Sequence, residues 1–432
     1  MPGSPRAFTS VHTDSREVRP GGLFFALKGA ETDGHRFLAD AVRNGATGVV
    51  VSEPVGVDGA EVFRVADTWE ALYDLAAARL AEVKPLVVGI TGSNGKTSTK
   101  EMVAAVLASR FGVLKTEGNL NTETGVPLTL LRLQPGEHQV AVLEMGMQGA
   151  GEIRRLAQLA RPRVGVVTGI GSVHIEFFAD GKEGIARAKG ELLEALPEDG
   201  LAVLNADDPF TDRVLRKLSR ARVVTFGLDG GDYRGLDYAS GSFKVGGVQV
   251  RLQQPGRHQA RNALAALAVG EFAGVPSSQG ARALGQVRSV EHRLQALPAP
   301  GGFIVVDDVY NASPESMLAA FETLAEARDG GRLLAVLGEM RELGEHADAE
   351  HRRVAEAAAK VFDEVCVVAG GFAGVLAEAA GASLVPDKPA AVRWVHEHAR
   401  PGDRVLVKAS HGVALEDVVQ ALLRPQPSAG SL

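Results

Sequence analysis

The chain has 432 residues, of which 45% are hydrophobic and 23% are charged, and its formal net charge at pH 7 is −7. A chain of this length exceeds one ordinary hydrophobic core, so two or three domains are expected. The composition excludes a disordered chain, the acidic balance argues against a nucleic-acid-binding surface, and no apolar run is long enough to span a bilayer. Because the opening MPGSPRAFTS lacks the apolar stretch of a secretory signal, we expect a cytoplasmic protein.

The first part of the chain, residues 1–84, is expected to be a small α/β domain. Short β-rich runs (GLFFAL, GVVVS and EVFRV) alternate with the helix-like stretches RFLADAVRNGA and TWEALYDLAAARLAEV. Pro85 cannot continue the last helix and disfavours helical backbone at Lys84. We therefore place the first domain boundary there.

The second part, residues 85–298, is expected to be an α/β domain around a parallel sheet. The run LVVGI is apolar almost throughout, as in a strand buried on both faces, and a helix is predicted over residues 96–110. Further strands are predicted at VAVLE, VGVVT and AVLN. Residues 229–256 are glycine-rich and short-stranded, with Gly246-Gly247 in the middle, which predicts an antiparallel hairpin insertion.

The third part, residues 299–432, is predicted to be another α/β domain of Rossmann-like type, joined by a linker near residues 298–302. Its predicted strands are FIVVD, LLAVL, EVCVV and RVLV, each followed by a stretch compatible with a helix, and the tail RPQPSAGSL is expected to be frayed. The single cysteine, Cys366, lies in the run EVCVV and is expected to pack in the core rather than to catalyse.

A phosphate-binding loop is predicted between the strand LVVGI and the helix that follows it. The sequence TGSNGKTS directs backbone N–H groups and the positive end of the helix dipole at one point, where a polyphosphate can bind. The ammonium of Lys96 can reach the β- and γ-phosphates and the hydroxyl of Thr97 can hold Mg²⁺. The loop departs from the strict Walker pattern because Ile90 stands where its first glycine would be. The predicted ATP-binding residues of this loop are Gly92, Ser93, Asn94, Gly95, Lys96, Thr97 and Ser98.

Several sequence blocks together resemble the Mur ligase family, and among its members the enzymes that add D-alanyl-D-alanine to UDP-N-acetylmuramoyl-tripeptide. The blocks occur in the order of the family and run from DSREVRPGGLFFALKG to VLVKAS, nearly the whole chain. The most specific are TGSNGKTSTKEM, EGNLNTETGVPLTLL, LEMGM, AKGELLEALP, EHRLQ and DDVYNASPESM. The resemblance implies an N-terminal domain that binds the UDP end of the substrate, a central ATPase and a C-terminal domain that admits the amine, acting as a monomer in peptidoglycan precursor synthesis.

The resemblance also implies the residues that hold ATP and two Mg²⁺ ions. Glu144 ends a predicted strand beside the phosphate loop and is expected to bind Mg²⁺ together with Thr97. His174 resembles the histidine ligand of a second metal, and Lys189 resembles a lysine that CO₂ carbamylates into an anionic ligand. With Lys96, these residues form the expected catalytic set. The remaining expected ATP contacts are Asn262 at the adenine, Arg293 at the phosphates and Asp308 at the ribose.

Substrate contacts follow from the same resemblance. Asn119 and Asn121 match a loop that contacts the muramoyl peptide, and Ser15 and Arg16 match a uridine-diphosphate contact, although a plain surface loop is a competing interpretation for the latter pair. The expected residues of the cleft in the C-terminal domain are Tyr310, Asn311 and Lys408; Tyr310 could equally serve packing.

The sequence departs from the family pattern at three places, and two other functions remain open. Gln259 replaces a common asparagine, Thr168-Gly169 replaces a frequent Thr-Asn, and Lys408-Ala409-Ser410-His411 replaces Lys-Gly-Ser-Arg. One alternative is another amino-acid ligase of the superfamily, such as the diaminopimelate- or lysine-adding enzyme or a folylpolyglutamate synthase. The other is a nucleotide-binding regulator without catalysis, which would be expected to lose at least one of Lys96, Glu144, His174 and Lys189.

Overall fold

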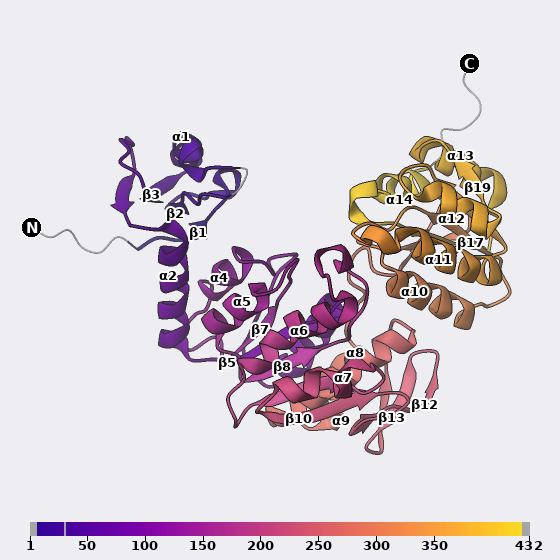
Figure 1. Cartoon of the computed structure of the whole chain (residues 1–432), viewed down its shortest axis with the longest axis horizontal. Coiled ribbons are helices and arrows are strands. Elements are labelled where there is room, and N and C mark those ends of the chain that lie inside the picture. The colour runs from indigo at the N-terminus through magenta and orange to yellow at the C-terminus, as the bar shows by residue number, and fades with distance from the viewer. Residues whose placement is uncertain (1–6, 30–31, 426–432) are drawn as a thin grey trace, which may run out of the picture.

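The computed structural model describes residues 7–29 and 32–425, whose elements gather into three bodies along the chain (Figure 1). The first six residues and most of the tail RPQPSAGSL lie outside this range, so the predicted fraying stays a prediction. The first body is built on a four-stranded parallel sheet with the order β1-β2-β3-β4. Its strands are β1 (Val11–His12), β2 (Gly22–Phe25), β3 (Ala46–Val51) and β4 (Glu61–Arg64).

A long helix, α2 (Thr68–Val83), joins the first body to the second. The Asp67 side chain caps it by accepting hydrogen bonds from the backbone N–H groups of Trp69 and Glu70. It ends at Lys84, whose φ of 53° turns the chain into Pro85 as the sequence predicts. In Figure 1, α2 runs from the first sheet alongside the second body, where it packs on α4 (Gly125–Leu130) and α5 (Glu152–Ala160). The other helices of the first body are η1 (Ser15–Glu17), η2 (Gly34–Phe37) and α1 (Leu38–Arg43).

The second body contains a seven-stranded, fully parallel sheet with the order β11-β10-β9-β8-β5-β7-β6. Its inner strands are runs of valine and leucine because helices cover both faces. Val88 and Val142 face α3 (Lys96–Ala108) and α8 (Arg257–Phe272), whereas Val87 and Leu143 face α5 and α6 (Gly181–Glu194). The strands are β5 (Leu86–Thr91), β6 (Val113–Lys115), β7 (Val140–Glu144), β8 (Val164–Val167), β9 (Leu201–Asn205), β10 (Arg222–Gly227) and β11 (Tyr233–Arg234).

The predicted antiparallel insertion is confirmed next to this sheet. Gly246 and Gly247 have φ of 53° and 79°, and this left-handed pair makes the tight turn that their sequence predicts. The three strands are β12 (Leu236–Ala239), β13 (Ser242–Val245) and β14 (Val248–Arg251). The remaining helices of this body are α3 (Lys96–Ala108), η3 (Ile175–Phe177), α6 (Gly181–Glu194), α7 (Phe210–Arg213), η4 (Leu215–Leu218), α8 (Arg257–Phe272) and α9 (Ser277–Leu284).

The third body has a six-stranded sheet with the order β15-β16-β20-β17-β18-β19, in which only β15 is antiparallel. The linker expected at residues 298–302 is instead the turn between β15 and β16, because residues 295–298 pair with β16. The third sheet thus begins ahead of the expected boundary at 298, and the domain limits of 84 and 298 stay predictions. The strands are β15 (Gln295–Pro298), β16 (Ile304–Asp307), β17 (Leu333–Leu337), β18 (Glu364–Val368), β19 (Ser383–Val385) and β20 (Arg404–Lys408).

Helices cover both faces of this third sheet, which confirms the predicted α/β class. Cys366 in β18 is fully buried among Val336, Val405 and Trp394, and burial raises the pKa of its thiol to about 12, so the predicted core role fits its surroundings. Among the described residues, no helix combines the length and apolarity needed to cross a membrane. The helices of this body are α10 (Pro314–Glu326), η5 (Gly344–His346), α11 (Ala347–Val361), α12 (Ala373–Ala380), α13 (Lys388–His398), η6 (His411–Val413) and α14 (Glu416–Leu423).

A buried histidine fixes the loop that follows β17. His351 is 0% exposed; its Nδ1 donates to the carbonyl oxygen of Ala347, and its Nε2 accepts the backbone N–H of Met340 at 2.9 Å. Burial lowers the pKa of His351, and only the neutral ring can make both hydrogen bonds. The loop after β17 therefore depends on an uncharged imidazole.

We predict that acid weakens the third body through His351. Below pH 6.5 the imidazole of His351 binds a proton in the unfolded chain but not in the folded chain. As the pH is lowered, the free energy of unfolding therefore decreases by up to about 1.4 kcal/mol per pH unit, until the pH reaches the pKa of the folded state. Between pH 7 and pH 5, the free energy of unfolding of His351→Gln should fall less than that of the unsubstituted protein, by a difference of at most about 2 kcal/mol. Denaturant titrations at both pH values measure this, followed by the fluorescence of Trp394 in a Trp69→Phe background.

The matched control is His346→Gln, which changes an exposed histidine close in sequence and should follow the unsubstituted protein. Equal acid sensitivity of His351→Gln and the unsubstituted protein would contradict the prediction.

Candidate active site

The loop between β5 and α3 forms one wall of a pocket of about 870 Å³ that lies between the second and third bodies. The fold creates it because a parallel sheet presents the ends of its strands and the starts of the following helices at one edge. Gly92 and Gly95 have φ of 148° and 82°, in the left-handed region. A Cβ at Gly92 would overlap the hydroxyl of Thr168, and one at Gly95 would press on the amide of Asn262. Only glycine fits at these two turns.

Lys96 is the first residue of α3, and its ammonium is folded back onto its own loop. Nζ donates to the carbonyl oxygens of Gly92 at 2.8 Å and Ser93 at 3.2 Å. Burial lowers the pKa of Lys96; the Glu144 carboxylate opposes this shift and the Arg293 guanidinium adds to it. The loop thus holds a cation that is poorly solvated and bound only by neutral carbonyl groups, so an anion in the pocket would stabilise it.

Glu144 ends β7, as predicted, and is 2% exposed. One carboxylate oxygen, Oε1, accepts a hydrogen bond from Asn121 at 2.8 Å, and the other, Oε2, is buried with no hydrogen-bond partner among the described residues. A buried carboxylate oxygen without a donor is costly. Glu144 is therefore suited to bind a cation at this edge of the sheet.

Lys189 lies on α6, 1% exposed, behind the wall of the pocket. Burial lowers the pKa of its amine well below the usual value, and the charge of Lys96 adds to the shift, whereas no carboxylate of the described residues counteracts it. A neutral, nucleophilic amine is the form that can take up CO₂. The surroundings of Lys189 fit the carbamylation that the resemblance implies.

His174 follows β8 in the loop that leads to η3, and its side chain lines the pocket. Its φ is 66°, a left-handed conformation that is unfavourable for a residue with a Cβ. Its Nδ1 lies 2.5 Å from Glu342 Oε2 of the third body. Within residues 7–29 and 32–425, no three His, Cys, Asp or Glu side chains gather into a metal site. A metal set made of Glu144 and His174 therefore needs other oxygen ligands, which Thr97, a carbamylated Lys189 and the phosphates can supply.

The third body contributes a second cationic wall. Arg293 donates to the hydroxyl of Thr97 at 2.9 Å and lies 4.0 Å above the ring of Tyr310. Lys408 pairs with Asp308 at 2.6 Å and donates to the carbonyl oxygen of Asn311 at 2.9 Å. Burial raises the pKa of Asp308, and the ammonium of Lys408 opposes the shift. The carboxylate expected to bind a ribose is thus held by a lysine from the neighbouring strand.

Most of the expected site residues line this pocket, but some do not. Asn262, from α8, lies beside Gly95 and donates to Gln259 at 3.3 Å, so the residue that departs from the family pattern contacts the expected adenine residue. Asn119 is exposed and away from the pocket. The expected residues that line it are Ser93, Asn94, Gly95, Lys96, Thr97, Ser98, Asn121, Glu144, His174, Asn262, Arg293, Asp308, Tyr310, Asn311 and Lys408.

The expected pair in the first body lies apart from this pocket. Ser15 is buried, and the exposed Arg16 forms a two-pronged hydrogen bond with Asp14. The structure therefore places Ser15 and Arg16 in η1 of the first body and leaves their binding role a prediction.

Sequence reasoning missed an acidic group on the pocket wall. Asp207 pairs with Arg261 of α8 at 2.6 Å, and Asp208 accepts the backbone N–H of Ile170 at 2.6 Å. Burial raises the pKa of Asp208. Both follow the predicted strand AVLN, so their position at the carboxyl end of a strand was a signal that could have found them.

A second missed group joins the two walls. Glu315 of α10 accepts hydrogen bonds from Ser172 and from Lys182, both of the second body, at 2.9 Å each. Ser313, at the start of the same helix, donates to the Asn94 side chain in the phosphate loop at 3.2 Å. These contacts link residues more than 100 positions apart, which no local sequence pattern indicates.

Three family models match the chain in order: "Mur ligase family, catalytic domain" at residues 7–94, "Mur ligase middle domain" at 90–270 and "Mur ligase, glutamate ligase domain" at 292–411. A relative from Synechocystis, named UDP-N-acetylmuramoyl-tripeptide--D-alanyl-D-alanine ligase, is 38% identical over 97% of this chain and 93% of its own length. A relative of the same name from Bacillus subtilis is 36% identical, with 96% and 93% covered.

Solved structures agree with these relatives. MurF from Acinetobacter baumannii superposes with a TM-score of 0.88 at 32% identity and covers 96% of this chain and 93% of its own. MurF ligase from Thermotoga maritima, in complex with ADP, superposes with a TM-score of 0.84 at 32% identity, with 96% of each chain covered.

We predict that Gly92→Ala disrupts nucleotide binding. The new methyl group would collide with the Thr168 hydroxyl, and alanine is strained at this φ, so the loop has to move. Affinity for ADP should fall about tenfold or more, in line with a loss of 1.4 kcal/mol or more of binding free energy. Calorimetric titration with ADP measures it. Gly230→Ala is the control, because its Cβ would meet open space, and an unchanged affinity in Gly92→Ala would refute the prediction.

Proposed function

The chain belongs to the Mur ligase family, and we propose that it joins D-alanyl-D-alanine to a UDP-N-acetylmuramoyl-tripeptide in peptidoglycan precursor synthesis. It is an ATP-dependent ligase of the acid–amino-acid type. The observation that carries the proposal is a pocket that unites a glycine-lined phosphate loop, two cationic walls and a buried carboxylate, one oxygen of which has no hydrogen-bond partner among the described residues. Relatives of this name match the chain over 93% of their own length.

The first chemical step activates an acid. Joining a carboxylate to an amine in water is uphill, so the terminal carboxylate of the tripeptide attacks the γ-phosphorus of ATP. A C–O–P bond forms, the bond to the β-phosphate oxygen breaks, and ADP leaves. The triphosphate is proposed to lie along residues 92–98. There the ammonium of Lys96 would exchange the loop carbonyl groups for the phosphates, and Arg293 would approach the phosphates from the third body. Asn262 and Asp308 are the proposed contacts of adenine and ribose.

Thr97, Glu144, His174 and Lys189 are the residues that would hold two Mg²⁺ ions. Bound magnesium would neutralise charge on the transferred phosphoryl group. The uncoordinated oxygen of Glu144 supports this assignment. The neutral amine of Lys189 would attack CO₂ to form a C–N bond and release a proton, which replaces a cationic group by an anionic oxygen ligand.

The second chemical step forms the amide. The amine of D-alanyl-D-alanine attacks the carbonyl carbon of the acyl phosphate, the C–O bond to phosphate breaks, and the nitrogen loses a proton. Tyr310, Asn311 and Lys408 are the proposed residues of the third body beside the incoming dipeptide. Asn119 and Asn121 are proposed for the muramoyl peptide, and Ser15 and Arg16 for the uridine diphosphate.

We assign residues 1–84 to the nucleotide-sugar domain, 85–298 to the ATPase and 299–432 to the amine-binding domain, whose sheet also takes in β15 just before that range. ATP, the nucleotide sugar and the dipeptide are water-soluble, so we propose a cytoplasmic location. We also propose that the enzyme is a monomer, as the resemblance implies. Because ATP and the nucleotide sugar are assigned to different domains, closure is expected to complete the site.

The acceptor test distinguishes this reaction from that of the related ligases. With ATP, Mg²⁺ and UDP-N-acetylmuramoyl-tripeptide, phosphate release is expected with D-alanyl-D-alanine and not with meso-diaminopimelate or without acceptor. A coupled phosphate assay and mass spectrometry of the product measure it. Phosphate release only with diaminopimelate, on the dipeptide precursor, would move the chain to the diaminopimelate-adding enzymes.

Lys96→Ala is expected to lower kcat by about 10³-fold, because the transferred phosphoryl group loses a fixed cation. Its thermal unfolding midpoint should not fall, since the removed ammonium is desolvated and bonded only to its own loop. Steady-state kinetics and calorimetry measure both effects. Lys217→Ala, an exposed lysine, is the control. Turnover of Lys96→Ala at the unsubstituted rate would be incompatible with this use of the phosphate loop.

A further inference from the structure

His174 and Glu342 meet across the boundary between the second and third bodies. His174 Nδ1 lies 2.5 Å from Glu342 Oε2. Both residues have left-handed backbone, with φ of 66° and 61°, although neither is glycine. Each such conformation costs on the order of 1 kcal/mol or more and persists only where the surroundings impose it. Because both residues of the contact are strained, we infer that the contact between their side chains has a function.

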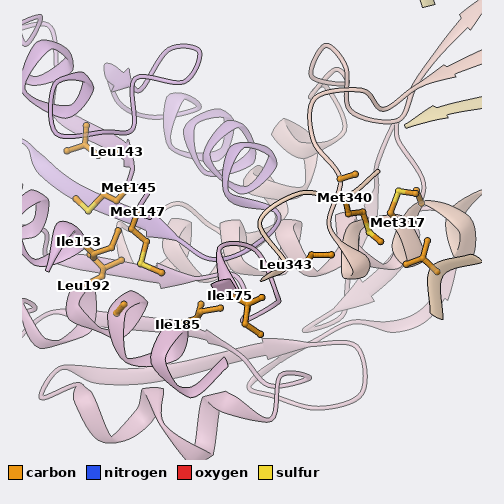
Figure 2. Close-up of a cluster of buried hydrophobic side chains, with 14 of the residues drawn as sticks. Leu143, Met145, Met147, Ile153, Ile175, Ile185, Leu192, Met317, Met340 and Leu343 are labelled. Atoms are coloured by element: carbon orange, nitrogen blue, oxygen red, sulfur yellow. The ribbon is translucent and has the colours of Figure 1, made fainter. Parts of the chain in front are cut away.

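Apolar packing on either side holds the two loops together. Ile175, next to His174, and Leu343, next to Glu342, are 8% and 1% exposed and belong to one buried cluster. Figure 2 shows Ile175 and Leu343 between the side chains of the second body and those of Met317 and Met340. The backbone of Gly344 lies so close to Glu176 that a Cβ there would come within 2.9 Å of it.

The loop that carries Glu342 is fixed at two further points. The backbone N–H of Met340 donates to buried His351 at 2.9 Å, and that of Arg341 donates to the Ser410 hydroxyl at 2.9 Å. Glu342 follows directly, so its carboxylate is presented by a rigid segment. A carboxylate fixed in this way can define the orientation of a neighbouring imidazole.

The contact occupies only one ring nitrogen of His174. Nδ1 is buried and lies 2.5 Å from Glu342 Oε2 without forming an aligned hydrogen bond, and the side chain lines the pocket. A carboxylate that lies against Nδ1 turns the ring so that the other nitrogen, Nε2, is left to bind a metal.

We propose that Glu342 is a positioning residue, which orients His174 from the third body so that Nε2 faces the active-site pocket. The inference rests on the proposed function, because it takes His174 as a metal ligand. It adds that the histidine is ordered only when the third body lies against the second. Metal binding and domain closure then stabilise each other, since each requires the same contact.

The test measures metal binding directly, without turnover. Mn²⁺ replaces Mg²⁺ and is titrated into the full chain with a non-hydrolysable ATP analogue, and free Mn²⁺ is read by electron paramagnetic resonance. Glu342→Ala should bind Mn²⁺ about 10- to 100-fold more weakly at its weakest site. Glu342→Gln, which keeps an oxygen acceptor, should recover part of that affinity. Glu345→Ala is the matched control: it removes a carboxylate of the same loop that is 91% exposed, and it should bind Mn²⁺ normally.

A double-mutant cycle tests whether Glu342 acts through His174. If it does, Glu342→Ala adds nothing to the loss caused by His174→Ala, whereas independent, additive losses would overturn the proposal. Normal Mn²⁺ binding by Glu342→Ala, with binding weakened in His174→Ala, would overturn the positioning role and leave the ligase assignment intact. Failure of the unsubstituted protein to use D-alanyl-D-alanine would overturn the proposed reaction instead. Thermal unfolding midpoints show that each variant is folded.

Discussion

Crowding of positive charge in one poorly solvated pocket is the constraint on which the rest of the structure depends. The chain as a whole is anionic, with a formal charge of −7, yet Lys96, Lys189 and Arg293 approach one another at the end of the parallel sheet. Arg293 disfavours the charged form of Lys96, Lys96 disfavours the charged form of Lys189, and the carboxylate of Glu144 opposes the shift of Lys96. Such an arrangement costs stability unless a polyanion neutralises it. The proposed triphosphate, with its metal ions, is what makes this local charge tolerable.

The same pocket explains why polar contacts link the second and third bodies beside the apolar packing of Ile175 and Leu343. Glu315 reaches Lys182, Ser313 reaches Asn94, and Arg293 reaches Thr97. Every one of these contacts touches the phosphate loop or the loop after β8 or its following helix. Polar groups of this kind can exchange one hydrogen-bond partner for a ligand at little cost in free energy. The residues that connect the two bodies are therefore also residues of the binding pocket. The roles proposed for the second and third domains agree with this position of the pocket between them.

Local sequence features predicted the wall that carries the phosphate loop, because an apolar strand, a glycine turn and a helix start are consecutive in the chain. They also predicted the position of Glu144 at a strand end and the turn at Gly246-Gly247. They failed where the chain pairs with distant parts of itself. Strand β15 was missed since its only reason to be a strand is its partner β16. The contacts of Glu315 and Glu342 depend on how the second and third bodies pack together, and the hydrophobic pattern of the sequence does not indicate this packing.

The packing of α2 on the second body restricts the length of a ligand that contacts both the first and the second body. The guanidinium of Arg155 lies 4.7 Å above the ring of Tyr73 and within 3.6 Å of Glu70, which fastens the helix to the second body. Its 16 residues measure ~24 Å end to end. Because this helix is held along its side, it fixes the position of the first sheet relative to the phosphate loop. Any molecule held at both places must span a set distance, so a shortened analogue could satisfy one end only.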